Sequence, residues 1–193
     1  LGATLLGGTL YVTSEFNRVR QDTAATLETV ADLKSRQITL WHYERLGDAR
    51  VVAQSADVAR FLAQPAPRRA EPGLLAHLET LRTSYGYAEI QVLDARLHPV
   101  LTWPEVSAEG VAARGPSAIP REALHQVRTG DLSRHTNGRI TMGITAPVVA
   151  TGSGESLGAV LLKIDPETSL YPQIRYWPAP TRTGETVLLR EDG

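Results

Sequence analysis

Seven residues that could hold a small molecule lie in segments with the alternating pattern of β-strands. In segments 87–93, 139–149 and 159–165, one set of alternate positions is apolar and the other is mixed. The mixed positions supply carboxylate, amide, hydroxyl and amine groups, and two aromatic residues with a polar end stand at strand ends. We expect these residues to line a ligand-binding site: Tyr87, Glu89, Gln91, Trp103, Thr141, Thr145 and Lys163. Two alternatives stay open, that Tyr87 and Trp103 are ordinary core aromatics and that the mixed face is exposed to solvent.

No set of residues in the sequence has the types and spacing of a catalytic, metal or cofactor site. The chain lacks the Gly-x-Ser-x-Gly motif of many hydrolases and the His-Glu-x-x-His motif of zinc enzymes. A histidine without other catalytic or metal-binding residues at a suitable spacing does not indicate a site. We therefore interpret all five histidines as surface residues: His42, His77, His98, His125 and His135. We therefore predict no enzymatic activity, no metal and no cofactor.

Two turns could bind an anion, but hairpin geometry explains both better. The glycine-rich run 152–158 lacks the Gly-Lys-Ser/Thr ending of a phosphate-binding loop. Arg134, His135 and Arg139 flank the Asn-Gly pair at 137–138, which is the strongest short hairpin signal. We favour a solvated hairpin tip at this second turn.

The polar set needs a sheet to position it, and the pattern predicts five strands. They fall at 87–93, 99–103, 132–136, 139–149 and 159–165. Short helices are expected at 48–63, 71–85 and 120–130, and the Gly-, Ala- and Pro-rich segment 104–120 is expected to be a loop. One face of the sheet should pack on helix, and the other should lie under that loop and enclose a pocket.

A single long helix precedes the sheet. From Thr13 to Leu46 apolar residues recur at helical spacing, and Gly and Pro are absent. We expect the helix to end near Gly47, in a left-handed C-cap, and a new helix to begin at Asp48. One apolar stripe of the long helix contains Val12, Phe16, Val19, Leu27, Val30, Ala31, Ile38 and Trp41.

The segment Leu1–Val12 carries no charge and reads as the end of a membrane span that continues into water. Twelve residues are fewer than the roughly 20 that cross a bilayer, so the span would be truncated. A buried helix or an apolar first strand is the alternative. Arg18 and Arg20 argue against an extracytoplasmic exit, because positive charge prefers the cytoplasmic side.

The composition excludes some classes of partner. The chain has 193 residues, a hydrophobic content of 42% and a net charge of −1. A nearly neutral chain gives no electrostatic case for nucleic acid binding. The absence of cysteine is compatible with an exported protein without disulfides.

The order of elements resembles the Cache family, the PAS-like extracytoplasmic sensor domains of bacterial transmembrane receptors. The resemblance rests on the emerging helix, the break at 46–50, the helix leading into 85–94 and the late strand 157–165. It covers Thr13 to about Pro180, and no single motif is diagnostic. It implies an α+β fold, with a long N-terminal helix packed on a five-stranded antiparallel PAS-like sheet with short helices.

The resemblance also implies a function. The domain would be the periplasmic ligand-sensing input of an inner-membrane receptor whose output is a histidine kinase, a diguanylate cyclase or a chemotaxis signaller outside this chain. The expected partners are a small-molecule ligand, the membrane through the N-terminal span, and a second copy through the long helix. The alternative is a structural, dimerisation or protein-interaction module with no small-molecule ligand.

The amino-acid-binding branch of the family does not match this chain. That branch uses a Tyr, Arg, Trp, Tyr set ahead of the third strand and an acid in the last strand. Lys163 stands at the position of the acid, with Asp165 two residues later, while Arg175, Tyr176 and Trp177 follow the fifth strand. The amino-acid site is therefore not carried over, and Lys163 favours an anionic ligand such as a carboxylate over an amine.

Four parts are expected along the chain. They are the end of a membrane span (1–12), the long helix with a second helix (13–63), the PAS-like sensor module (64–166), and a connector with the first strand of a truncated membrane-proximal module (167–193). The part of the long helix from Val30 to Trp41 should pack on the sheet. The part around Phe16 and Val19 then needs another cover, either the missing module or a second subunit.

Overall fold

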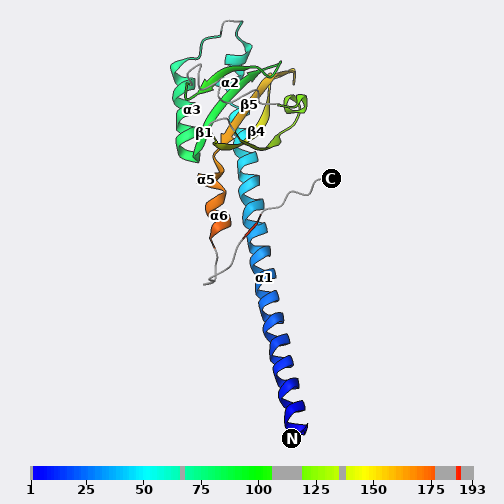
Figure 1. Ribbon diagram of the computed structural model, residues 1–193. Coiled ribbons are helices and arrows are strands. Elements are labelled where there is room, and N and C mark those ends of the chain that lie inside the picture. The colour runs from blue at the N-terminus through cyan, green and yellow to red at the C-terminus, as the bar shows by residue number, and fades with distance from the viewer. Residues whose placement is uncertain (1, 66–67, 106–118, 135–137, 177–185, 188–193) are drawn as a thin grey trace. The chain divides into compact units, whose positions relative to one another are not determined.

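The computed structural model describes residues 2–65, 68–105, 119–134, 138–176 and 186–187, with backbone alone for 2–13. It divides into two compact units, one of Leu1–Leu40 with Gln173–Gly193 and one of Trp41–Pro172. Helix α1 (Gly2–Ala53) contributes residues to both units (Figure 1).

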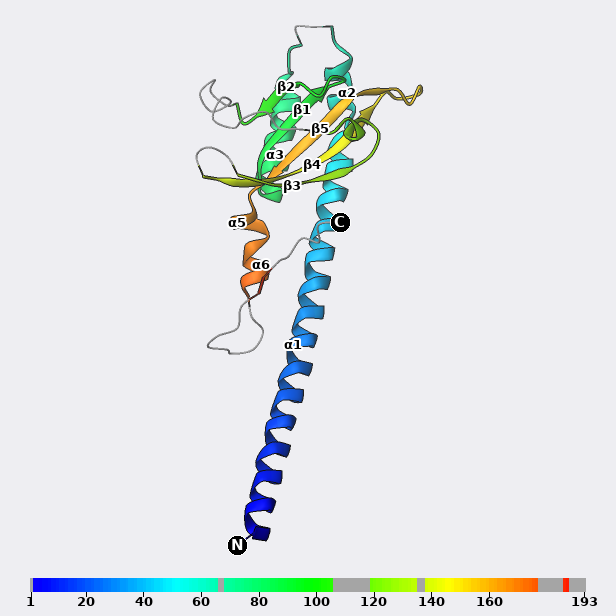
Figure 2. The same cartoon turned by 45° about the vertical axis from the view of Figure 1, so that its right-hand side comes forward.

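The second unit is built on a five-stranded antiparallel sheet in the order β2-β1-β5-β4-β3 (Figure 2). The strands are β1 (Tyr87–Asp94), β2 (Pro99–Trp103), β3 (Arg128–Arg134), β4 (Ile140–Val149) and β5 (Ser156–Ile164). The predicted α+β fold and the antiparallel five-stranded sheet are confirmed.

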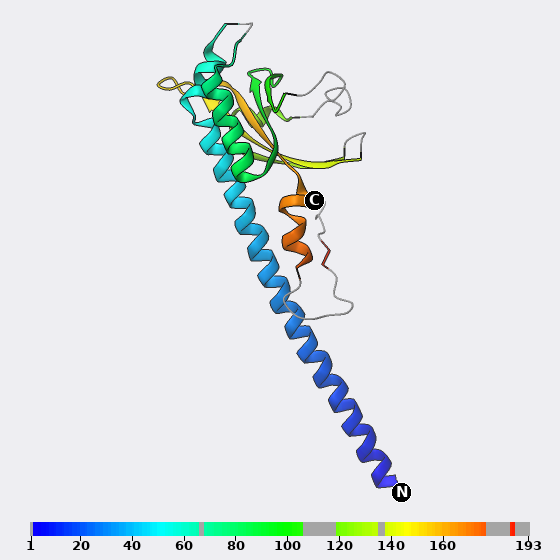
Figure 3. The ribbon, with the colours of Figure 1, turned by 90° about the vertical axis from the view of Figure 1, so that its left-hand side faces the viewer.

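Helices cover one face of this sheet. Helix α2 (Ala56–Ala63) contacts β4 and β5, and helix α3 (Pro72–Tyr85) contacts β1 and β2 (Figure 3). The apolar positions of the strands alternate toward these helices and make the core, which includes the fully buried Val58, Leu78, Ile90, Val92, Ile144, Val160 and Leu162. Helix α3 starts with a proline in its first turn and ends at Gly86 (φ 71°), as its sequence predicts.

Helix α1 does not end at Gly47, and the predicted break there is wrong. It continues to Ala53, and its added turns bury Ala49, Val52 and Ala53. A glycine inside a helix costs up to about 1 kcal/mol relative to alanine, which burial of this apolar segment offsets. His42, Arg45 and Asp48 of α1 form hydrogen bonds with residues of the strands, and they follow the segment 30–41 for which we expected contact with the sheet.

Because Gly47 lies inside a helix, we expect Gly47→Ala to stabilise the protein. A Cβ added at Gly47 meets no atom within 4 Å, so the substitution should stabilise the protein by about 0.5–1 kcal/mol. Gly86→Ala is the control and should destabilise, because its φ of 71° is a left-handed conformation. Thermal melts compare the two variants. Destabilisation by Gly47→Ala would indicate that the helix ends there after all.

The helix predicted at 120–130 is much shorter in the structure. A single 3₁₀ turn, η1 (Arg121–Leu124), takes its place, and β3 already begins at Arg128. Residues 128 and 129 pair with Thr145 and Ile144 of β4, so ladder hydrogen bonds override the local helical pattern. The predicted loop 104–120 and the predicted first strand of the membrane-proximal module, within 181–189, lie largely outside the described residues.

The first unit consists of α1 up to Leu40 and the chain from Gln173. Helix α5 (Pro166–Ser169) and helix α6 (Tyr171–Arg175) follow β5 and lead into it. Lys34, on the apolar stripe of α1, is buried, and its amine donates hydrogen bonds to the carbonyls of Gln173 and Tyr176. Burial lowers the pKa of Lys34. Within the described residues, no helix is both long enough and apolar enough to cross a bilayer.

Candidate functional site

The sheet face opposite α2 and α3 carries polar side chains in adjacent register positions. Glu89 of β1, Lys163 of β5 and Gly143 of β4 form one row across three strands. Gln91, Leu161 and Thr145 form the next row. Because strand side chains alternate, both rows point to the same face. We call Glu89, Gln91, Thr141, Thr145 and Lys163 the polar-face set.

An ion pair lies at the centre of this set. The Lys163 amine is 3.2 Å from Oε1 of Glu89, and Nε2 of Gln91 donates a 2.6 Å hydrogen bond to the same oxygen. Glu89 and Lys163 are only 3% and 6% exposed. Two buried opposite charges at this distance stabilise each other in the low-dielectric interior, although both have lost their hydration.

The hydroxyl residues of the set are buried as well. Thr141 and Thr145 are less than a tenth exposed, and Oγ1 of Thr145 donates a 3.4 Å hydrogen bond to the carbonyl of Arg128. Four of the five members of the set are therefore buried, which rules out the alternative of a solvent-exposed mixed face for them.

Glycine at position 143 lets this face pack closely. A Cβ at this position would lie 2.8 Å from Cδ1 of Leu161, so the leucine occupies the space above the glycine. The alternating pattern places Gly143 on this face, but nothing in the sequence indicates that Leu161 fills the space left by the missing side chain.

Beyond the row of Gln91, Leu161 and Thr145 the face becomes apolar. Leu161 forms a buried cluster with Leu93 and Ala159, and Leu97, Ile119 and Leu124 pack against it. Since η1 contacts both β4 and β5, it lies over this apolar end. A face with a polar end and an apolar end is the arrangement expected of a small-molecule site, in which few polar groups fix the orientation of a largely apolar-lined ligand.

Tyr87 lies on the opposite face, with the helices. A register shift between Tyr87 and Glu89 pairs Tyr87 with Ile164, so Tyr87 does not share the mixed face with the other residues expected at the site. The Tyr87 hydroxyl donates a 2.6 Å hydrogen bond to Oδ2 of Asp48, and Arg45 lies 3.1 Å from the same oxygen. Burial and the Asp48 carboxylate raise the pKa of Tyr87.

Trp103 also faces the helix layer. It pairs with Ile90, a core residue of that face, and its indole Nε1 donates a 2.7 Å hydrogen bond to Oε2 of Glu79 in α3. Arg82 and Trp103 together lower the pKa of Glu79 to about 2. Both aromatics predicted as ligand contacts are thus engaged in holding helices on the sheet, and the candidate site reduces to the polar-face set.

Asp165, Arg139 and His42 have structural partners. Asp165 caps α5 by accepting a hydrogen bond from the Glu167 amide and lies 3.0 Å from Arg139. Nε2 of His42 is 2.6 Å from the Thr129 hydroxyl. Over the described parts of the chain, no three His, Cys, Asp or Glu side chains converge on a point where a metal could bind.

The fold resembles that of a known class of structures, the ligand-binding sensor domains of bacterial receptors. The sensor domain of the Vibrio cholerae histidine kinase DctB superposes with a TM-score of 0.64 at 14% identity, covering 81% of this chain and 60% of that one. The likeness confirms the Cache-type resemblance at the level of the fold.

Two chemoreceptor structures are similar in the same way. The ligand-binding domain of Pseudomonas fluorescens CtaA in complex with L-serine has a TM-score of 0.54 at 17% identity, with coverages of 80% and 64%. That of the Pseudomonas aeruginosa PAO1 amino acid chemoreceptor PctC in complex with GABA has a TM-score of 0.52 at 16% identity, with coverages of 76% and 66%. The chain thus spans less than two thirds of the length of these structures. No family model and no curated protein matches its sequence.

Proposed function

We propose that the chain is the extracytoplasmic ligand-sensing input domain of a membrane-bound signal-transduction receptor. The output would be a histidine kinase, a diguanylate cyclase or a chemoreceptor signaller on another segment. The observation that carries the proposal is the buried polar-face set, in a fold shared with ligand-binding sensor domains. The solved structures that share the fold are binding domains, which supports a non-enzymatic role.

The proposed ligand is a small molecule held by the polar-face set and the apolar cluster beside it. The charge argument from Lys163 alone is weakened, because Glu89 lies within 3.2 Å and the pair has no net charge. An anionic ligand would have to compete with Glu89 for the lysine. We therefore propose a ligand that contacts the pair as a whole, through both donor and acceptor groups.

A homodimer through α1 and a membrane anchor belong to the same proposal. The stripe residues Phe16, Val19 and Leu27 are all more than half exposed, and exposed apolar side chains along one helix face suit a helix partner. In a symmetric dimer the same residues of two copies would face each other. The apolar segment 1–12 supports an anchor at the N-terminal end.

A thermal-shift screen tests the ligand. A compound at a hundred times its dissociation constant should stabilise the folded state by about 2.7 kcal/mol. The panel holds amino acids, carboxylates, amines and neutral polar compounds. We expect a hit whose shift is lost in Gln91→Leu, which removes the hydrogen bond to Glu89, and kept in the control Gln21→Leu, the same change at an exposed position of α1.

Two results would count against this assignment. A hit with the same shift in Gln91→Leu would place its site elsewhere. A panel without any stabilising compound would favour the alternative of a structural or dimerisation module.

A further inference from the structure

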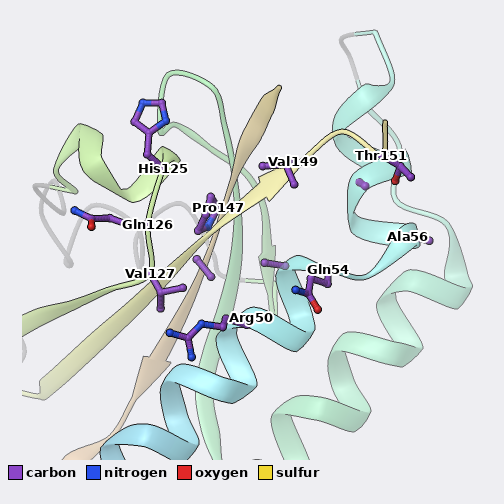
Figure 4. A pocket seen from close by; sticks show the side chains of 12 residues that line it. Arg50, Gln54, Ala56, His125, Gln126, Val127, Pro147, Val149 and Thr151 are labelled. Carbon is purple, nitrogen blue, oxygen red and sulfur yellow. The ribbon is translucent and has the colours of Figure 1, made fainter. Parts of the chain in front are cut away.

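A concave site lies in the same unit, away from the polar-face set. It is a groove of about 500 Å³ between the end of α1, the start of α2, the segment that joins η1 to β3, and the end of β4 (Figure 4). This volume falls in the range typical of small-molecule sites. None of the five residues of the polar-face set lines it.

The groove forms where β4 continues beyond the end of its pairing with β3. Pairing between β3 and β4 stops at Arg128 and Thr145, while β4 continues to Val149. The preceding residues, His125 to Val127, lead away from the sheet edge and form one wall (Figure 4). The continuation of α1 past Gly47 supplies the opposite wall, with Arg50 and Gln54.

The lining combines an apolar floor with polar side chains that have no partner among the described residues. Ala53, Ala59, Pro147 and Val149 are among the apolar residues. Five polar residues border the groove, and in the described part of the chain their side chains make no hydrogen bond or ion pair: Arg50, Gln54, His125, Gln126 and Thr151. None of the described residues that line the groove carries a carboxylate, so Arg50 gives this lining a positive charge.

We propose that this groove binds a small organic carboxylate. The planar guanidinium of Arg50 presents two parallel N–H groups that match the two oxygens of a carboxylate, and the apolar floor accepts a short hydrocarbon body. Gln54 and Thr151 supply further donors at the rim. The site is independent of the ligand proposed for the polar-face set, and it gives the domain a second place at which a metabolite acts.

Hexanoate, hexylamine and 1-hexanol test the proposal, because they share one hydrocarbon body and differ in the head group. Titrations of the ¹⁵N-labelled chain followed by NMR locate the site and give the dissociation constant. Hexanoate should shift amides of residues 50–59, 125–127 and 146–151, and hexylamine should not. Arg50→Met should weaken hexanoate binding about tenfold or more, since it removes a charge-assisted hydrogen bond.

Two control variants check that the loss of binding in Arg50→Met arises in the groove. Arg20→Met makes the same change at an exposed position of α1 and should leave hexanoate binding unchanged. Gln91→Leu should leave it unchanged too, because Gln91 belongs to the polar-face set. The proposal is overturned if hexanoate gives no saturable shifts at millimolar concentration, if Arg50→Met binds it as well as the wild type, or if hexylamine produces the same shifts.

Discussion

Lys163→Met is expected to destabilise the second unit by about 3–5 kcal/mol, the loss typical of a buried ion pair that is left with one partner. The substitution keeps most of the volume of the side chain but removes the charge 3.2 Å from Glu89. Glu89 is 3% exposed, so its carboxylate cannot recover the lost stabilisation from water. A loss of this size is a large fraction of the stability of an ordinary domain.

The double variant Glu89→Leu/Lys163→Met should recover most of that loss. An apolar pair of similar volume has no charge to desolvate, and such replacements are often neutral or stabilising. The fold therefore does not need this ion pair for its stability, and we expect the pair to serve ligand binding. The double variant should therefore fold and at the same time lose the ligand-induced thermal shift.

Denaturant unfolding of Glu89→Leu, Lys163→Met and the double variant completes a double-mutant cycle. The cycle gives the coupling free energy between the two side chains. Arg139→Met is the matched control, because it breaks the more exposed pair with Asp165 and should change stability by less than about 1 kcal/mol. Equal, small effects of Lys163→Met and Arg139→Met would show that Glu89 and Lys163 are hydrated and that the polar face is open.

The sheet and its polar face could be predicted because they depend on patterns of period two. The alternation in β1, β4 and β5 assigned Glu89, Gln91 and Lys163 to one face, and the register confirms that they share it. Tyr87 is two residues before Glu89 and follows the same alternation. It was misplaced because a single register shift turns it to the other face, and no residue type signals that shift.

The groove was not predictable, because its residues meet only through tertiary packing. Arg50 lies on α1 because that helix continues through Gly47, against the local signal for a helix end. His125 lies opposite because ladder pairing shortened the predicted helix at 120–130 to one turn. Both differences arise where long-range contacts outweigh local propensity, and they bring together residues some 75 positions apart in the sequence.

Two charge substitutions test which parts of helix α1 are buried within a single chain. Trp41 and Phe16 lie on the same stripe of the helix, yet Trp41 is 6% exposed and Phe16 is 68% exposed. The inner residue thus belongs to a core within one chain, while the outer one is covered by nothing in the described structure. Exposed positions of this kind usually tolerate substitution within about 0.5 kcal/mol.

Trp41→Asp is expected to unfold the second unit. Removing a buried aromatic side chain costs about 3–5 kcal/mol, and the introduced carboxylate adds the penalty of a buried charge.

Phe16→Asp should leave the melting temperature of the sheet nearly unchanged but weaken self-association, because it places a charge on the proposed dimer stripe. Tyr43→Asp is the control, since Tyr43 is 65% exposed and lies on the opposite side of α1. Circular dichroism melts and sedimentation of the three variants decide the matter. Equal losses of stability from Trp41→Asp and Phe16→Asp would mean that the whole of α1 is a core helix of one chain, and equal effects of Phe16→Asp and Tyr43→Asp on sedimentation would remove the stripe as a dimer interface.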